Sequence, residues 1–266
     1  MKIFDTYRSF LNKYVSTLEE FAPLWVFNII QTVIFVSIGF FMGAFIHPIL
    51  LILFTVFPFY LLYHFLIIAQ KYDSALKQSF VWTITIALLV IILTVIFPDL
   101  AKRAIISGES YTEEMFYWIK TGIGAESDPS QFVPTHILHY SIFVVTCLIS
   151  MSFIGIIFGA YLMNYMDYYV GMLFLHIADP TPTNYLIIAL IAWPIWAIIR
   201  VIGYLYTGLA LAIPLTTRIF GQEFSDVKNE FKKYIITGLV LIVLDMILKA
   251  ILAPLYQQIF HAIIAP

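Results

Sequence analysis

Four ionisable residues lie inside long apolar stretches of this sequence: Asp167, Arg200, Asp245 and Lys249. Asp245 and Lys249 are four residues apart, so on a helix they lie one turn apart and can form an ion pair. Charged side chains in such segments usually face other protein groups or water, where they can bind an ion or polar solute or carry protons. The four formal charges sum to zero. We predict that they form one polar centre.

A structural role is the alternative for these four charges. Asp245 and Lys249 can form a static ion pair that holds helices in register, and Arg200 can extend from a helix end to the lipid headgroups. Both roles require the same residue types. The four therefore stand as candidates for ion or proton transfer, with the static role left open.

Three histidines and one asparagine are secondary candidates: His64, His136, His139 and Asn164. His136 and His139 are three residues apart, so both could contact one metal or one partner from a single helix face. A haem with two axial histidines would need matching ligands on other helices. No His-Glu-x-x-His or Glu-x-x-His motif is present, and the single cysteine, Cys147, excludes a thiolate cluster. We expect no metal and no haem.

Catalysis has little support in the sequence. Ser141, Ser150 and Ser152 follow the histidines, but no Gly-x-Ser-x-Gly or other nucleophile motif surrounds them. We do not expect an enzyme.

The stretch from Leu244 to Lys249 resembles the Leu-Asp-x-x-x-Lys of the seventh helix of microbial rhodopsins, in which the lysine carries retinal. The resemblance covers about a dozen residues, including Trp82 and the aromatic pair Trp193 and Trp196. It implies Lys249 as the site of a retinal Schiff base. Val81 stands where a counterion carboxylate would precede Trp82, so this sequence departs from the pattern and we expect no bound retinal.

The composition defines the setting of these residues. The chain has 266 residues, of which 62% are hydrophobic and 11% charged, whereas soluble domains carry roughly 25% charged residues. The longest polar stretch, 99–135, is shorter than a typical minimal domain of about 50 residues. The formal net charge of −2 offers no basic surface for nucleic acid. We predict an all-α integral membrane protein with a single transmembrane domain over 1–266.

Apolar runs and their boundaries predict a polytopic bundle of six or seven transmembrane helices. Five spans are expected at 24–45, 49–69, 79–97, 184–215 and 234–255, with a polar loop at 71–78. Segment 1–21 lacks a signal-peptide core and suits an amphipathic helix on the membrane surface. The 99–135 loop is predicted to lie outside the membrane, with an interfacial helix near 112–120.

The remaining run, 136–178, has two interpretations. In the first, a single long helix ends at a belt of tyrosines and leaves Asp167 at the interface. In the second, the chain reverses near 150–155 and crosses again, which places Asp167 within the membrane. The second gives seven spans and puts the basic loop that holds Arg218 and Lys228 in the cytoplasm with the N-terminus, as basic residues prefer. We favour seven spans in a cytoplasmic-type membrane, with the C-terminus outside.

Prolines and small residues predict local features of the bundle. Pro58, Pro194 and Pro254 are expected to kink or break their spans. Gly155 and Gly159, four residues apart, are small enough to let two helices approach closely, and Gly203, Thr207 and Gly208 can do so too.

Three functional hypotheses follow from the sequence. The first is a small transporter or channel-like protein that moves an ion, proton or small polar solute through the charged centre. The second is a non-catalytic subunit or scaffold that packs against membrane-protein partners or against copies of itself. The third is a protein that bears haem on its histidines or retinal on Lys249. In each case the first partner is the lipid bilayer.

Overall fold

The computed structural model describes residues 6, 9, 13, 17, 23–124, 126–221 and 223–264. Apart from those four isolated positions, the predicted amphipathic segment 1–21 lies outside the described residues. Within the described part the chain is helical, and its only extended pairing is an isolated bridge between Ile177 and Ile264.

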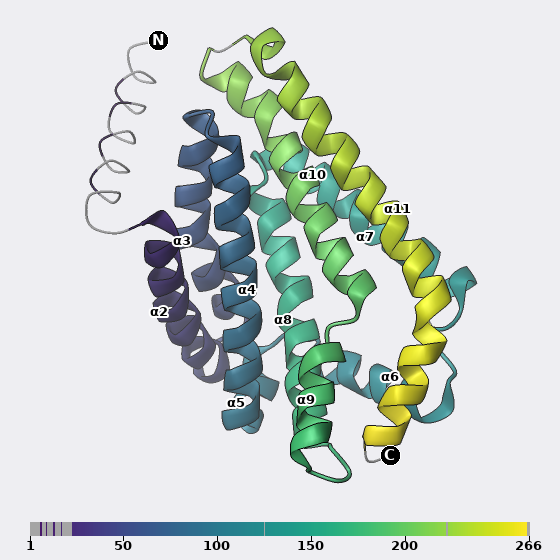
Figure 1. The fold of residues 1–266 in the computed structure, drawn as a ribbon. Coiled ribbons are helices and arrows are strands. Elements are labelled where there is room, and N and C mark those ends of the chain that lie inside the picture. Colours follow the sequence, from purple (N-terminus) through teal and green to yellow (C-terminus); the bar gives the residue numbers. More distant parts are fainter. Residues whose placement is uncertain are drawn as a thin grey trace.

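The structure is a bundle of helices (Figure 1). They are α2 (Leu24–Phe45), α3 (Ile49–Ile68), α4 (Tyr72–Ile96), α5 (Pro98–Ala104), α6 (Gly108–Thr121), α7 (Pro129–Ser150), α8 (Phe153–Leu175), α9 (Pro182–Ile191), α10 (Ile195–Ile219) and α11 (Phe224–Ile263). Within the described residues, 6 segments are long and apolar enough to cross a membrane: α2, α3, α4, α7, α9 with α10, and α11. The predicted all-α polytopic membrane bundle is confirmed.

The first three spans follow the sequence closely. A turn at His47 separates α2 from α3, and Pro48 precedes the first residue of α3. The predicted loop at 71–78 is wrong, because α4 already begins at Tyr72. Asp73 in the first turn of α4 favours this early start, since an acidic side chain stabilises the partly positive N-terminus of a helix.

The ambiguous run 136–178 contains a reversal at Met151 and Ser152. Both residues have left-handed backbone conformations, with φ of 50° and 71°. The Ser152 hydroxyl donates a hydrogen bond of 2.6 Å to the carbonyl of Gly208, which fixes the turn against α10. α8 is 23 residues long and packs against α3, α4, α6 and α7. The single-helix interpretation is wrong, and Asp167 is fully buried within the bundle.

The predicted span 184–215 is broken in the structure. α9 ends at Ile191 and α10 starts at Ile195, with Pro194 as the residue before its first turn. Proline has no N–H to donate and disfavours helix in the residue before it, here Trp193, which explains the break. Pro58 and Pro254, by contrast, lie inside continuous helices.

α10 and α11 form a closely packed helical hairpin. A side chain at Gly238 would meet the Thr207 backbone nitrogen at 3.0 Å and the Gly203 carbonyl oxygen at 3.1 Å. The two backbones approach this closely only because the residues between them are small. The predicted role of Gly203 and Thr207 in close helix contact is confirmed, whereas that of Gly159 is wrong, because nothing lies within 4 Å of a side chain added there.

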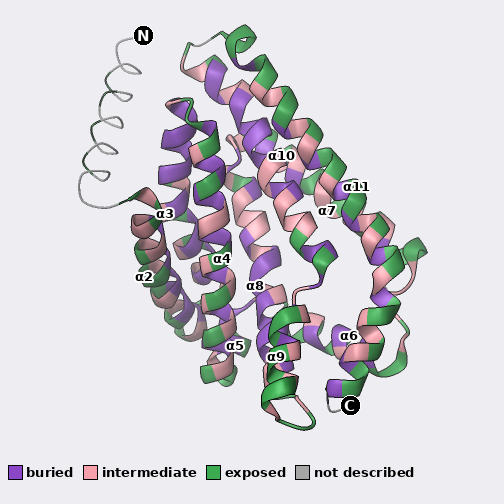
Figure 2. Cartoon of the chain, in the orientation of Figure 1, coloured by how far each residue is buried: buried purple, intermediate pink, exposed green. Residues whose placement is uncertain are grey.

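Exposed residues lie along the outer faces of the helices (Figure 2), and many of them are large and apolar. On α4, the outward-facing Ile84, Leu88 and Ile92 are 58%, 58% and 50% exposed. They repeat every fourth residue, so they form one stripe along the helix. An apolar stripe of this length on a spanning helix suits contact with lipid. The chain is therefore an integral membrane protein.

The predicted helix near 112–120 corresponds to α6, which lies beside the end of α11 in Figure 1. Its buried face carries Met115, Trp118 and Ile119. The Gln257 side chain on α11 donates a hydrogen bond of 2.7 Å to the Ile119 carbonyl. These contacts hold α6 against the bundle next to the loop that leads into α7.

Candidate functional site

Arg200 on α10 and Asp245 on α11 form a two-pronged ion pair in the α10–α11 hairpin. Arg200 Nε lies 2.8 Å from Asp245 Oδ2, and Arg200 Nη2 lies 3.0 Å from Oδ1. The two parallel bonds match the planar fork of a guanidinium to a carboxylate, which makes this a strong and directional contact. The Asp245 side chain is 1% exposed and the Arg200 side chain 19%.

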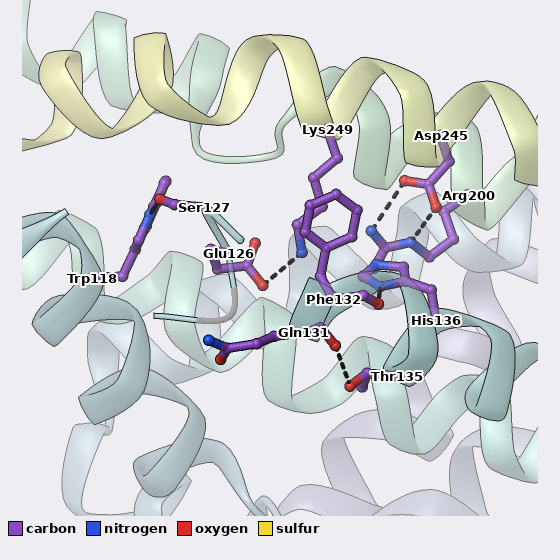
Figure 3. Close-up of polar contacts among 10 residues, drawn as sticks. All are labelled: Trp118, Glu126, Ser127, Gln131, Phe132, Thr135, His136, Arg200, Asp245 and Lys249. Atoms are coloured by element: carbon purple, nitrogen blue, oxygen red, sulfur yellow. Dashed lines mark hydrogen bonds and ion pairs between the residues drawn. The ribbon is translucent and has the colours of Figure 1, made fainter. Parts of the chain in front are cut away.

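Lys249 on α11 forms a second ion pair with a residue of the α6–α7 loop. Its Nζ lies 2.8 Å from Glu126 Oε1. The same ammonium group stands 4.7 Å from the centre of the Phe132 ring, where a cation is attracted to the face of the aromatic ring. Figure 3 shows Lys249 and Asp245 leaving one helix toward these different partners.

The predicted Asp245–Lys249 pair is therefore wrong. Among the described residues no ion pair joins the two side chains, although they are one turn apart on α11. A helical spacing of four residues permits a contact but does not require one when each side chain has a better-placed partner. Arg200 offers Asp245 two aligned donors, and Glu126 reaches Lys249 from the loop.

Asp167 does not belong to this centre, and the prediction of a single four-residue cluster is wrong. Its carboxyl oxygens are buried, and the structure gives them no hydrogen-bond partner among the described residues. The side chain of Asn164, three residues earlier on α8, is likewise buried with no partner in that part of the chain. Gly171, one turn beyond Asp167 on α8, lies directly against Thr94 of α4.

His136 and His139 lie near Arg200, whereas His64 does not contribute to this site. The His136 Nδ1 is 2.6 Å from the Phe132 carbonyl, and its buried Nε2 has no partner within the described chain. His64 is buried against Tyr60, with the two rings stacked at 5.4 Å. No group of three His, Cys, Asp or Glu side chains within the described residues is arranged to hold a metal ion.

A pocket of about 80 Å³, called here the histidine pocket, lies between α3, α4, α7, α8 and α10. Its volume exceeds the roughly 10–15 Å³ that one water needs, so several waters fit. The walls are mostly apolar and aromatic, with a few convergent polar groups. The polar residues among them are Tyr63, Ser79, Thr83, His136, His139, Tyr165, Arg200 and Tyr204.

A second, smaller pocket of about 30 Å³, called here the break pocket, lies at the interruption between α9 and α10. Its wall combines the break, the start of α10, part of α8 and the α6–α7 loop. The lining residues are Tyr111, Met115, Glu126, Met166, Tyr169, Val170, Ala192, Trp193, Pro194, Trp196, Ala197 and Arg200.

The two pockets share one stretch of wall, formed by Met166, Ala197 and Arg200. Arg200 is the only charged residue of the three, and its two bonds to Asp245 fix the position of its guanidinium. Arg200, held by Asp245, therefore lies on the wall that the two pockets have in common.

Sequence reasoning missed Glu126, Tyr169 and Trp193 as site residues. Glu126 belongs to a segment whose composition predicts only a turn, and nothing local to it indicates that it reaches α11. Trp193 carries a usable signal, because it precedes Pro194 within an apolar span. A break at that proline brings the tryptophan and the start of α10 to the break pocket.

No family model, no curated protein and no solved structure matches this chain.

Proposed function

We propose that this chain is a membrane transporter that moves a small solute across the bilayer along a route past Arg200. The observation that carries the proposal is the position of Arg200 on the shared wall of the histidine pocket and the break pocket. A charged side chain in a spanning helix is costly, and such residues generally mark a solute or ion pathway.

The break between α9 and α10 supports the same proposal. Many transporters bind their solute where a spanning helix is interrupted, because the interruption frees backbone groups to contact it. Here the break lines one of the two pockets, and Arg200 lies on α10 one turn beyond Trp196. The histidine pocket would admit the solute on one side of Arg200 and the break pocket on the other.

A swelling assay in liposomes tests this function with a panel of small solutes. Liposomes with and without protein are mixed with an excess of urea, glycerol, potassium chloride or potassium formate. Valinomycin is added with the two salts, so that potassium can follow the anion across the membrane. We expect at least one solute to enter faster when protein is present. The paired variant Arg200→Met with Asp245→Leu should fold and lose that entry. If no solute enters faster than into empty liposomes, the proposal fails.

A further inference from the structure

Two hydrogen-bond donors on the wall of the break pocket have no acceptor among the described residues. Tyr169 is 3% exposed, and its hydroxyl has no partner among the described residues. The buried Nε1 of Trp193 likewise lacks an acceptor in the described chain. An indole N–H can only donate a hydrogen bond, so Trp193 requires an acceptor. Buried polar groups are nearly always satisfied, so two such donors in one pocket indicate a missing acceptor.

The start of α10 adds backbone donors to the same wall. The first backbone bonds there run from Ala197 and Ile198 to the Pro194 carbonyl, and within the described chain no backbone hydrogen bond from the N–H of Trp196, which lines the pocket, is formed. Free N–H groups and the helix dipole make such an N-terminus partly positive. Anions bind at helix N-termini for this reason. Tyr169 provides independent evidence, since it comes from α8.

Arg200 contributes positive charge one turn further along α10. Its Nε and Nη2 donate to Asp245, and neither of these bonds uses Nη1. Tyr111 on α6 lines the pocket too, and burial raises the pKa of its phenol well above the usual range, so it stays a neutral hydroxyl. The wall is therefore rich in donors.

Glu126 is the one acidic residue among the described residues that line the break pocket, and it limits what can bind there. Lys249 neutralises it at 2.8 Å, but its carboxylate still repels a second negative charge nearby. A water needs roughly 10–15 Å³ of cavity volume, so the pocket of about 30 Å³ has room for about two or three waters. These two limits exclude a large or doubly charged ligand.

We propose that the break pocket binds a small monovalent anion of the size of chloride or formate. Tyr169, Trp193 and the N-terminus of α10 supply the donors, and the negative charge of Glu126 on the same wall weakens binding. This inference deepens the proposed function by naming a solute class, and it rests on that function only for the step from binding to transport.

Binding is tested on the purified full-length protein in detergent, with sodium chloride and sodium formate as probes and sodium gluconate as the reference salt. We expect chloride or formate to raise the melting temperature of the wild type relative to gluconate at equal ionic strength. Titration should show that Tyr169→Phe with Trp193→Phe weakens binding by about tenfold or more, because two donors are lost. Glu126→Gln should tighten binding several-fold.

The matched control changes one exposed tyrosine and one exposed tryptophan in the same way. Tyr185→Phe with Trp25→Phe alters residues that are 42% and 53% exposed, and the anion response should not change. If the double pocket variant does not fold, Tyr169→Phe and Trp193→Phe are titrated singly, and each should weaken binding. The inference is overturned if neither wild type nor Glu126→Gln responds to either anion. It is also overturned if the folded pocket variants respond like the wild type.

The two proposals fail separately. Anion binding without entry of any solute into liposomes would overturn transport and leave the anion site standing. Entry of urea or glycerol without anion binding would overturn the anion site and leave transport standing.

Discussion

At the scale of single residues, the charged centre consists of two ion pairs that join different elements. Arg200–Asp245 connects α10 to α11, and Glu126–Lys249 connects the α6–α7 loop to α11. The sequence indicated the importance of Arg200, Asp245 and Lys249, since charges in apolar runs need a reason to be there. It could not give the pairing, because Glu126 is 123 residues away from Lys249 along the chain.

We predict that replacing one residue of the Arg200–Asp245 pair lowers the free energy of unfolding strongly, whereas replacing both residues lowers it much less. Arg200→Met or Asp245→Leu alone leaves a buried charge without its partner, which costs about 3–5 kcal/mol by precedent in soluble proteins. The double variant removes the desolvation cost together with the attraction and should recover most of that loss. Unfolding in mixed micelles measures all three variants.

The control for this cycle is Lys249→Met combined with Asp245→Leu. Asp245 should couple more weakly to Lys249 than to Arg200, because only Arg200 bonds it directly. A stronger coupling of Asp245 to Lys249 would contradict the pairing described here.

At the scale of elements, the sequence was most informative where a boundary has a local chemical cause. The turn at Pro48 and the first span coincide with the structure, and α6 lies where acidic and basic residues predict a helix. The start of α4 was not predicted, and Pro194 was expected either to kink its span or to break it. A proline in an apolar run is compatible with a kink, a break or a continuous helix, and tertiary packing decides among them. Pro58 and Pro254 show the continuous case.

Packing in the α10–α11 hairpin gives an element-scale prediction. Gly238→Ala should destabilise the protein by about 1–3 kcal/mol, because the new methyl group meets backbone atoms of Thr207 and Gly203 that cannot move aside. Gly159→Ala on α8 is the matched control, since nothing lies within 4 Å of a side chain added there. That control should be neutral or stabilising by up to about 1 kcal/mol. Equal destabilisation of both variants would contradict the close hairpin.

The start of α7 should depend on pH through Asp128. Its carboxylate accepts hydrogen bonds from the Ser130 hydroxyl and backbone N–H and from the Gln131 side chain, which hold the pKa of Asp128 below its usual range. A lowered pKa in the folded state means that this stabilisation is fully present above the unfolded value of about 3.9. It is lost as the pH falls through the lower folded value.

Hydrogen exchange measures this effect at the first turn of α7. Protection of residues 130–133 should fall below about pH 4 in the wild type and should already be low at neutral pH in Asp128→Ala. Glu114→Ala, at an exposed acid on α6, should leave that protection unchanged. Equal protection of the α7 start in wild type and Asp128→Ala at neutral pH would show that the cap is not formed.

At the scale of the whole molecule, the helix directions define two ends of the bundle. Figure 1 shows the α3–α4 and α10–α11 turns at one end, and α5, α6 and the end of α11 at the other. The first end carries Lys71 and Arg218 near the turns. Composition alone predicted the class of protein. It could not predict the reversal before α8, because that turn is fixed by the hydrogen bond from Ser152 to the carbonyl of Gly208 on α10.

We predict that the end with the α3–α4 and α10–α11 turns faces the cytoplasm, because basic loops are retained there. Reporter fusions at residues 70, 125 and 221 and at the C-terminus test this orientation. Residues 70 and 221 should report the cytoplasmic side, and residue 125 and the C-terminus the opposite side. A C-terminus on the cytoplasmic side would contradict the arrangement.

Access of water to both sides of Arg200 within the membrane is the most direct test of the proposed solute route. In a Cys147→Ala background, Gly159→Cys places a thiol in the histidine pocket and Ala192→Cys places one in the break pocket. The control is Leu88→Cys, on the lipid-facing stripe of α4. We predict that a charged, water-soluble methanethiosulfonate reagent modifies both pocket cysteines in intact membranes and leaves the Leu88→Cys control unmodified. Failure of both pocket cysteines to react, while a lipid-soluble maleimide modifies them, would contradict a solute route past Arg200.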